Sequence, residues 1–212
     1  MKIPIEKRIK RRRQLEMARM QDVLVDFVVS LPSPAVFHGG TAIWRVYGGR
    51  RFSEDLDFYY VWKDSKGIKE RLDSFIQPFD MQLRKFKSTG NTIFSDIERN
   101  GIHVKLEFSN QEKEGIIGSY ERVDGTFVSV YVLPPEEIFK EKVDAFLSRH
   151  LVRDLYDLIT LYPLCDKRRI RQAVAALKAG IEKPKDMDIL KTIVIDGLAP
   201  TYDQMRRTIM RW

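Results

Sequence analysis

The sequence has 212 residues, of which 43% are hydrophobic and 32% charged, and its formal net charge is +7. This composition excludes a disordered or collagen-like chain and predicts a soluble globular protein with room for one full core or two small lobes. The one cysteine, Cys165, excludes an intrachain disulfide and a multi-cysteine metal site, which favours a reducing, cytoplasmic location.

The positive charge is concentrated at the N-terminus. Residues 1–13 contain seven Lys or Arg side chains and a single acidic one, Glu6, so they carry +6 of the net +7. Such a segment is attracted to phosphate backbones, so it is compatible with binding to nucleic acid or to an anionic surface, although a solvated start of a helix is an equal alternative. Asp26 interrupts the short apolar stretch that follows, and no segment is long enough to span a membrane. We therefore expect neither a signal peptide nor a membrane protein.

The first two thirds of the chain alternate between helical and extended patterns. Apolar residues at three- and four-residue steps predict a helix over 14–31, which Pro32 and Pro34 end. The next expected elements are a strand over 35–38, a helix over 41–47, a strand over 55–62 and a helix over 65–75. Further strands are expected over 81–88, 91–97, 102–109 and 126–133, so the middle of the chain is mainly sheet.

The composition changes after Pro134-Pro135. Helical spacing is present over 136–147, 151–162 and 168–178, and in two segments after Pro184 and Pro200. Strands first and helices afterwards predict an α+β fold with a mixed sheet, not a doubly wound parallel sheet. We expect an α+β lobe with a basic N-terminal helix over residues 1–133 and a helical lobe over residues 134–212.

The turn Gly39-Gly40-Thr41 joins an expected strand to an expected helix. Backbone N–H groups at the start of a helix are unpaired and carry partial positive charge, so phosphate is their natural ligand. A Gly-Gly pair by itself is more often an ordinary turn.

Two aspartates occupy alternate positions in the strand that follows. Because successive side chains of a strand point to opposite faces, Asp55 and Asp57 project together and Leu56 and Phe58 project into the core. Two carboxylates on one face form a hard-oxygen site suited to Mg²⁺ or Mn²⁺. The alternative is a solvated strand face with arginine counter-ions from Arg50 or Arg51, which leaves the repulsion between like charges less well explained.

A second strand repeats this pattern and places Lys105 and Glu107 on its polar face. If this strand lies beside the aspartate strand, Glu107 completes a cluster of three carboxylates, which is the kind of site that holds two divalent ions for in-line phosphoryl displacement. Without that neighbour, Lys105 and Glu107 are more typical of an exposed charge pair across strands.

The Gly-Gly-Thr turn, the short helix and the segment Arg-Phe-Ser-Glu-Asp-Leu-Asp-Phe over residues 51–58 resemble the first motif of the polymerase-β-type nucleotidyltransferases, most closely the AbiEii/AbiGii toxin family. The family's later Lys-x-Asp/Glu strand is matched by Lys105 and Glu107. Its Glu-x-Lys helix is matched in form only by Lys140-Glu141-Lys142, and its Arg-Asp-x-x-Asp helix by residues 153–157. The resemblance covers about residues 35 to 162.

This resemblance implies a polymerase-β-like nucleotidyltransferase lobe and a role for each matched residue. Asp55, Asp57 and Glu107 would hold Mg²⁺ or Mn²⁺, and Glu107 would help to deprotonate the acceptor hydroxyl. Gly39, Gly40, Thr41, Lys142 and Asp154 would bind the NTP, with Lys142 neutralising its phosphates and acting as a catalytic residue with the three carboxylates. From the residues alone, Lys142 is more typical of a surface lysine, and Asp157 is better explained as an ion-pair partner that orients Lys142 or Arg149 than as a metal ligand.

The resemblance also implies a function. We expect a metal-dependent nucleotidyltransferase that moves NMP from NTP to an acceptor hydroxyl, with RNA and specifically the 3′ end of tRNA as the acceptor, acting as the toxin of a toxin–antitoxin pair with a cognate antitoxin protein as partner. Two alternatives stay open: transfer to a protein hydroxyl, and a non-catalytic nucleotide- or RNA-binding protein. Tyr59 shares the carboxylate face and is suited to stacking on a base.

Overall fold

The computed structural model describes residues 3–212 and divides them into two compact units. The first unit contains the described part of Met1–Val46 together with Ser53–Leu133, and the second contains Tyr47–Phe52 together with Pro134–Trp212. The second unit is therefore built from two stretches of chain, because six residues that precede the aspartate strand group with the C-terminal helices. A functional division into two lobes at residues 133 and 134 stays a prediction.

The first unit is built on a seven-stranded mixed sheet. Its order, within residues 3–212, is β3-β4-β5-β2-β1-β7-β6. β1 runs parallel to β7 and β2 runs parallel to β5, whereas the remaining neighbours are antiparallel. This arrangement confirms the predicted α+β fold with a mixed sheet. The strands are β1 (Val36–His38), β2 (Leu56–Tyr59), β3 (Gln82–Ser88), β4 (Thr92–Arg99), β5 (Ile102–Ser109), β6 (Ile116–Glu121) and β7 (Phe127–Val132).

The strand β6 is not predicted by its sequence pattern. Gly118 and Ser119 interrupt the apolar alternation on which a strand prediction depends. A side chain at Gly118 would meet the side chains of Val132 and Val46 at 2.7 Å. The glycine that weakens the strand signal therefore allows close packing at this position.

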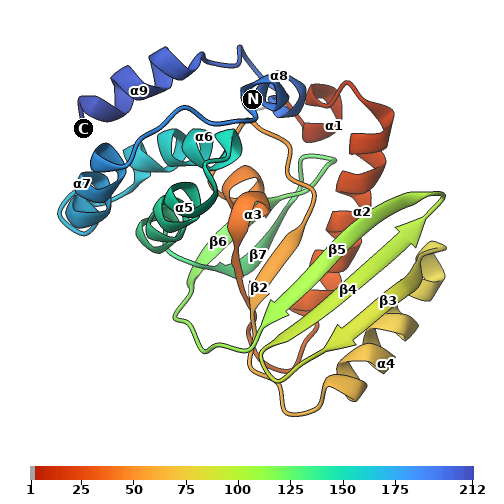
Figure 1. The fold of residues 1–212 in the computed structure, drawn as a ribbon. Coiled ribbons are helices and arrows are strands. Elements are labelled where there is room, and N and C mark those ends of the chain that lie inside the picture. Colours follow the sequence, from red (N-terminus) through yellow and green to blue (C-terminus); the bar gives the residue numbers. More distant parts are fainter. Residues whose placement is uncertain (1–2) are drawn as a thin grey trace. The chain divides into compact units, whose positions relative to one another are not determined.

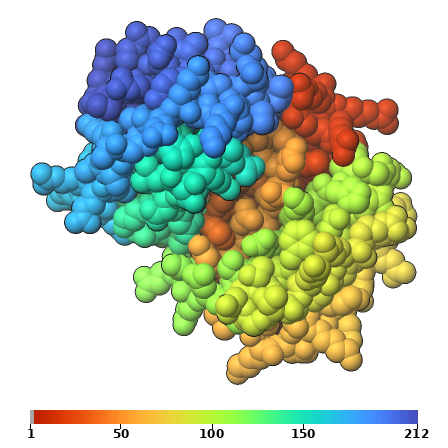
Figure 2. Space-filling view, in the orientation of Figure 1, coloured from red at the N-terminus to blue at the C-terminus, as the bar shows by residue number. Residues whose placement is uncertain are grey.

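Four α-helices belong to the described part of the first unit: α1 (Ile5–Arg8), α2 (Arg12–Val29), α3 (Gly39–Arg45) and α4 (Ser65–Ile76), and the 3₁₀ helix η1 (Gln77–Phe79) follows α4. The basic N-terminal segment thus forms the short α1 and the start of α2. α2 packs on β5 and α4 packs on β3, so both helices cover one face of this half of the sheet (Figure 1). The other face of β3, β4 and β5 is uncovered in Figure 2.

A buried polar network joins α2, α3 and β6. The Arg45 guanidinium donates to the Tyr120 hydroxyl at 2.8 and 3.0 Å and pairs with Asp22, and the Tyr120 hydroxyl donates to Asp22 Oδ1 at 2.9 Å. Burial raises the pKa of Asp22 even though Arg45 acts against that change. Buried polar groups are tolerated when they satisfy one another in this way.

The second unit contains five α-helices among its described residues: α5 (Pro135–Arg149), α6 (Val152–Leu161), α7 (Arg171–Ala179), α8 (Met187–Ile193) and α9 (Tyr202–Met210), with the 3₁₀ helix η2 (Tyr162–Leu164) after α6. α5 and α6 pack against each other, α7 packs on α5, and α8 and α9 pack on α6. The helices predicted after residue 134 are therefore confirmed. Across residues 3–212, the structure contains no helix with both the length and the apolar character needed to cross a bilayer.

Candidate active site

The Gly-Gly-Thr turn lies directly against the aspartate strand. β1 ends at His38 and α3 begins at Gly39, whose φ of +75° falls in the region that favours glycine. A Cβ atom at Gly39 would lie 2.4 Å from Asp57 Oδ2, so a side chain there would displace the carboxylate. Thr41 is fully buried, and its hydroxyl donates to the backbone carbonyl of Asp55. In the structure this turn positions both aspartates, and its contact with a nucleotide stays a prediction.

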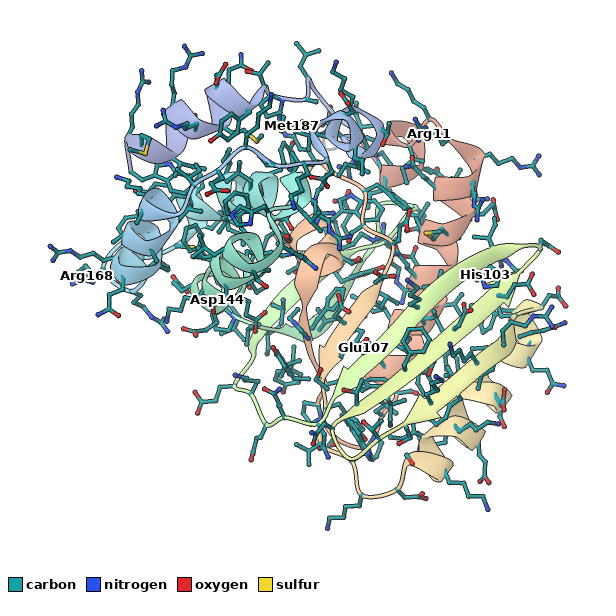
Figure 3. The ribbon with its side chains drawn as sticks, viewed as in Figure 1. Arg11, His103, Glu107, Asp144, Arg168 and Met187 are labelled. Atoms are coloured by element: carbon teal, nitrogen blue, oxygen red, sulfur yellow. The ribbon has the colours of Figure 1, made fainter. Side chains whose placement is uncertain are left out.

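The strand order brings Asp57 and Glu107 side by side. β2 pairs with β5 so that Asp57 and Glu107 are register partners, and β1 pairs with β2 so that His38 and Asp57 are register partners. His38, Asp57 and Glu107 therefore form one row across three adjacent strands. The neighbouring position of the two acidic strands, which the sequence could only assume, is confirmed. Figure 3 labels Glu107 on β5 beside β2, with His103 towards the opposite end of β5.

Asp55 lies one residue before β2 and has a different partner. Its Oδ1 is 3.8 Å from Lys105 Nζ, and both side chains are well exposed, at 42% and 57%. Lys105 therefore forms an exposed charge pair with Asp55, and its charge also acts on Glu107. An exposed pair at this distance contributes little to stability, so Asp55 is held weakly.

The pKa of Glu107 reflects the negative charge that is crowded around it. Burial raises the pKa of Glu107, the charges of Asp57 and Asp55 raise it further, and His38 and Lys105 oppose the change. A positive ion would relieve this repulsion, and carboxylate oxygens are the ligands that Mg²⁺ and Mn²⁺ prefer, so the donor chemistry fits a divalent cation. Within residues 3–212, however, no three His, Cys, Asp or Glu side chains are gathered closely enough to hold a metal ion.

An aromatic surface adjoins the carboxylates. The rings of His38 and Tyr59 stack with their centroids 3.9 Å apart, and Lys113 Nζ lies 5.4 Å from the centre of the Tyr59 ring. A pocket of about 340 Å³ borders Tyr59 and is lined also by Val36, Lys113 and Tyr131. Sequence reasoning identified Tyr59 but missed His38, because only the strand order places that histidine beside Asp57.

The other predicted site residues, Lys142 and Asp154, belong to the second unit and form a separate charged cluster. Lys142 Nζ lies 3.3 Å from Asp154 Oδ1 and 3.0 Å from Asp157 Oδ2. Arg149 donates two hydrogen bonds of 2.7 Å to the Asp154 carboxylate. The interpretation of Asp157 as an ion-pair partner of Lys142 is confirmed. Asp154 is fully buried among cations, and its role towards a nucleotide stays a prediction.

Arg51 completes this cluster. Its Nε and Nη2 atoms each donate a 2.6 Å hydrogen bond to the carboxylate of Asp157. The sequence alternative that made Arg51 a counter-ion of Asp55 and Asp57 does not describe this contact. The two partners are 106 positions apart in the chain, and no local spacing signals such a pair.

Burial alone would raise the pKa of Asp154, but the hydrogen bonds from Arg149 and the charge of Lys142 outweigh it, so this pKa lies below its ordinary value. The direction is opposite to that of Glu107. The second unit therefore stabilises carboxylates in their charged form, whereas the carboxylate face of the first unit resists that form.

Comparison with known proteins identifies the family. A family model described as the nucleotidyl transferase AbiEii toxin of type IV toxin–antitoxin systems matches residues 22–210. The crystal structure of JHP933 from Helicobacter pylori is similar, with a TM-score of 0.62 and 24% identity over 94% of this chain and 88% of that one. A crystal structure of a candidate nucleotidyltransferase from H. pylori also has a TM-score of 0.62, with 23% identity over 94% of this chain and 91% of that one.

At these identities the two structures establish the fold alone, and no functionally curated protein matches the sequence. The family match, in contrast, extends over nearly the whole chain and includes the turn, both acidic strands and the charged helices. The chain therefore belongs to the AbiEii nucleotidyltransferase toxin family and is a nucleotidyltransferase.

Proposed function

We propose that this nucleotidyltransferase moves NMP from NTP to the 3′ hydroxyl of tRNA, in a reaction that depends on Mg²⁺ or Mn²⁺, and that it acts as a toxin. The observation that carries the proposal is the register pairing of Asp57 with Glu107, with Gly39 packed against Asp57. This places acidic oxygens and a glycine turn at one point of the sheet. The family supports nucleotidyl transfer and an antitoxin partner.

In the proposed reaction the acceptor oxygen attacks the α-phosphorus of the NTP. A new P–O bond forms, the bond from the α-phosphorus to the bridging oxygen breaks, and pyrophosphate leaves. Glu107 takes the proton of the acceptor hydroxyl, a role that its raised pKa favours because a more basic carboxylate is a better proton acceptor. Gly39, Gly40 and Thr41 bind the triphosphate, and Lys142 neutralises its charge.

Asp55, Asp57 and Glu107 are the residues that would hold the divalent ions. Bound there, the metal would supply positive charge that activates the attacking hydroxyl and stabilises the leaving pyrophosphate. The repulsion among these carboxylates supports this assignment, since acids gathered on one face cost free energy that a bound cation would offset.

The basic N-terminus supports RNA as the acceptor. Lys7, Lys10 and the run Arg11 to Arg13 are exposed, whereas Arg8 is held by Glu121 at 2.6 Å. Several basic side chains therefore stay at the surface, where they attract phosphate without reading sequence. A cytoplasmic location, where tRNA is found, accompanies this proposal as a prediction.

The test is to incubate the purified protein with Mg²⁺, each of the four labelled NTPs in turn, and total cellular RNA plus protein, and to separate the products on a gel. We expect label in a tRNA-sized band that is lost in Asp57→Ala. Asp96→Ala is the matched control, because Asp96 lies on the same sheet but pairs with His103 at 3.0 Å. Label on protein would mean that the acceptor is a protein hydroxyl instead of tRNA. No label with any NTP would favour a non-catalytic nucleotide- or RNA-binding protein.

A further inference from the structure

A row of side chains runs from the carboxylates to the edge of the sheet. Asp57 on β2 is the register partner of Glu107 on β5. On the far side of β5, Glu107 is the register partner of Phe94 on β4, and Phe94 is that of Lys87 on β3. Register partners project to the same face of a sheet. Neighbouring strands lie about 4.8 Å apart, so Lys87 is on the order of 10 Å from Glu107 across the sheet.

The face that carries this row is open. The helices α2 and α4 pack on the opposite face of β3, β4 and β5, where Ile93, Ile97 and Leu106 are buried. Figure 2 shows the face of the row uncovered. Phe94 alternates with Ile93 along β4, so it leaves part of its ring exposed on the open face instead of packing into the core.

Positive charge gathers on the β3 side of this face. β3 carries Arg84, Lys85 and Lys87 and no acidic residue. Arg84 is bound to Glu98 at 2.6 Å, whereas Lys85 and Lys87 are exposed and take part in no ion pair with residues 3–212. Lys85 Nζ lies 5.6 Å from the centre of the Phe94 ring. Two unpaired ammonium groups therefore flank one aromatic ring on the open face.

Lysines on β3 also have a structural explanation. β3 is an edge strand of the sheet, and charged side chains on an edge strand prevent it from pairing with another chain. This explanation does not account for a partly exposed aromatic ring on the next strand inward. Nor does it account for the continuation of the row to Glu107.

We infer that this face, which we name the Phe94 face and define by Lys85, Lys87 and Phe94, binds single-stranded RNA. The two lysines attract phosphates, and Phe94 stacks on a base, which is the combination that holds single strands without reading their sequence. In a duplex the bases are stacked inside, so Phe94 has no base to contact. That the bound strand ends at Glu107 with its 3′ hydroxyl rests on the proposed function, whereas RNA binding rests on the Phe94 face alone.

Fluorescence anisotropy of a labelled single-stranded oligouridylate of about 12 nucleotides tests the inference, with the full chain and without NTP or metal ion. Phe94→Leu keeps an apolar side chain but loses the ring, so it weakens binding about fivefold or more. Lys85→Gln/Lys87→Gln also weakens binding. This double variant lowers the slope of log affinity against log salt by about 1.4, because each phosphate contact on a single strand contributes about 0.7.

The helix α4, on the opposite side of the sheet, provides matched controls. Lys66→Gln/Lys69→Gln removes the same charge from exposed positions of α4 and leaves the salt slope unchanged. Phe79→Leu replaces a ring that is 43% exposed in the 3₁₀ helix after α4, and it leaves affinity unchanged. The basic N-terminal segment is the same in every variant, so its attraction for RNA cancels in these comparisons.

Three results overturn the inference: a wild-type protein that does not bind the oligonucleotide, a Phe94→Leu variant that binds it like wild type, and a double lysine variant with the wild-type salt slope. A double lysine variant that keeps this slope but self-associates in gel filtration would indicate edge protection. A blunt RNA duplex of the same length is the second probe. If Phe94→Leu weakens duplex binding as much as single-strand binding, the claim of a single-strand site is wrong.

The same variants distinguish this inference from the proposed function. RNA binding that follows the Phe94 face, in a protein that transfers no nucleotide, would support the RNA site and contradict the transferase. Nucleotide transfer that needs Asp57, in a protein whose RNA binding ignores the Phe94 face, would do the reverse. In an active enzyme, we expect Phe94→Leu to raise KM for the RNA acceptor and to leave KM for NTP unchanged.

Discussion

The two charged regions of this protein, the carboxylate face of the first unit and the ion-paired cluster of the second, have opposite electrostatic properties. On the carboxylate face of the first unit, Asp57 and Glu107 are register partners on adjacent strands, and like charge raises the pKa that burial has already raised at Glu107. In the second unit, two carboxylates are enclosed by three cations, and the pKa of Asp154 is held low. A cation would relieve the repulsion in the first region, whereas the carboxylates of the second are already paired with cations.

The strongest test of this comparison is a substitution of Asp57, for which we expect the largest effect. We expect Asp57→Asn to lower nucleotide transfer by about a thousandfold or more, because a metal-binding carboxylate supplies several kcal/mol of transition-state stabilisation. The free energy of unfolding should not fall, because the substitution relieves repulsion with Glu107. Steady-state kinetics and urea unfolding of the same preparation test both parts. A variant that keeps full activity would remove Asp57 from the chemistry.

At Asp154, in contrast to Asp57, we expect a substitution to lower the free energy of unfolding. Asp154→Ala deprives Lys142 and Arg149 of a fully buried carboxylate, and loss of one partner from a buried ion pair costs about 3 kcal/mol. Urea unfolding should show this loss, with Asp144→Ala, an exposed position on the neighbouring helix α5, as the control within about 0.5 kcal/mol of wild type. If Asp154→Ala unfolds like wild type, the second region is not preorganised by its ion pairs.

Much of the secondary structure could be predicted from the sequence, because helical spacing and strand alternation are local. The pairing of Asp57 with Glu107 could not, since it depends on β2 lying parallel to β5, and alternation predicts a face without predicting a neighbour. The partner of Arg51 was missed for the same reason, as Asp157 lies on a helix 106 positions away. Strand alternation found both acidic strands, whereas the role of Lys142 towards a nucleotide was predicted only from the family resemblance.

The pH dependence of stability should sharpen the contrast between the two regions. Glu107 has a raised pKa in the folded protein, so the folded state binds the extra proton and stability falls as pH rises from the ordinary glutamate value of about 4.5 through the raised pKa. Asp154 has a lowered pKa, so its contribution is present above its ordinary value of about 3.8 and is lost as pH falls through the lowered one.

Unfolding curves of Glu107→Gln and wild type between pH 4 and pH 8 test the first of these effects. We expect the variant to gain stability relative to wild type as pH rises, and Mg²⁺ to reduce that gain by offsetting the charge of Glu107 in the wild-type protein. A constant difference across this range would mean that Glu107 does not experience the crowding that defines the first region.

The smallest effect is expected at Lys105, which pairs with Asp55. Its contact with Asp55 spans 3.8 Å between two well-exposed side chains, and such pairs contribute at most about 1 kcal/mol. Lys105→Ala should therefore leave the free energy of unfolding nearly unchanged, but it removes a positive charge that competes with a metal ion for Asp55. If the first region gains from a cation as proposed, the variant needs less Mg²⁺ for half-maximal transfer than wild type. A higher requirement would mean that Lys105 assists the reaction directly. Lys105 would then belong with the residues that supply positive charge, although it lies beside the carboxylates of the first region.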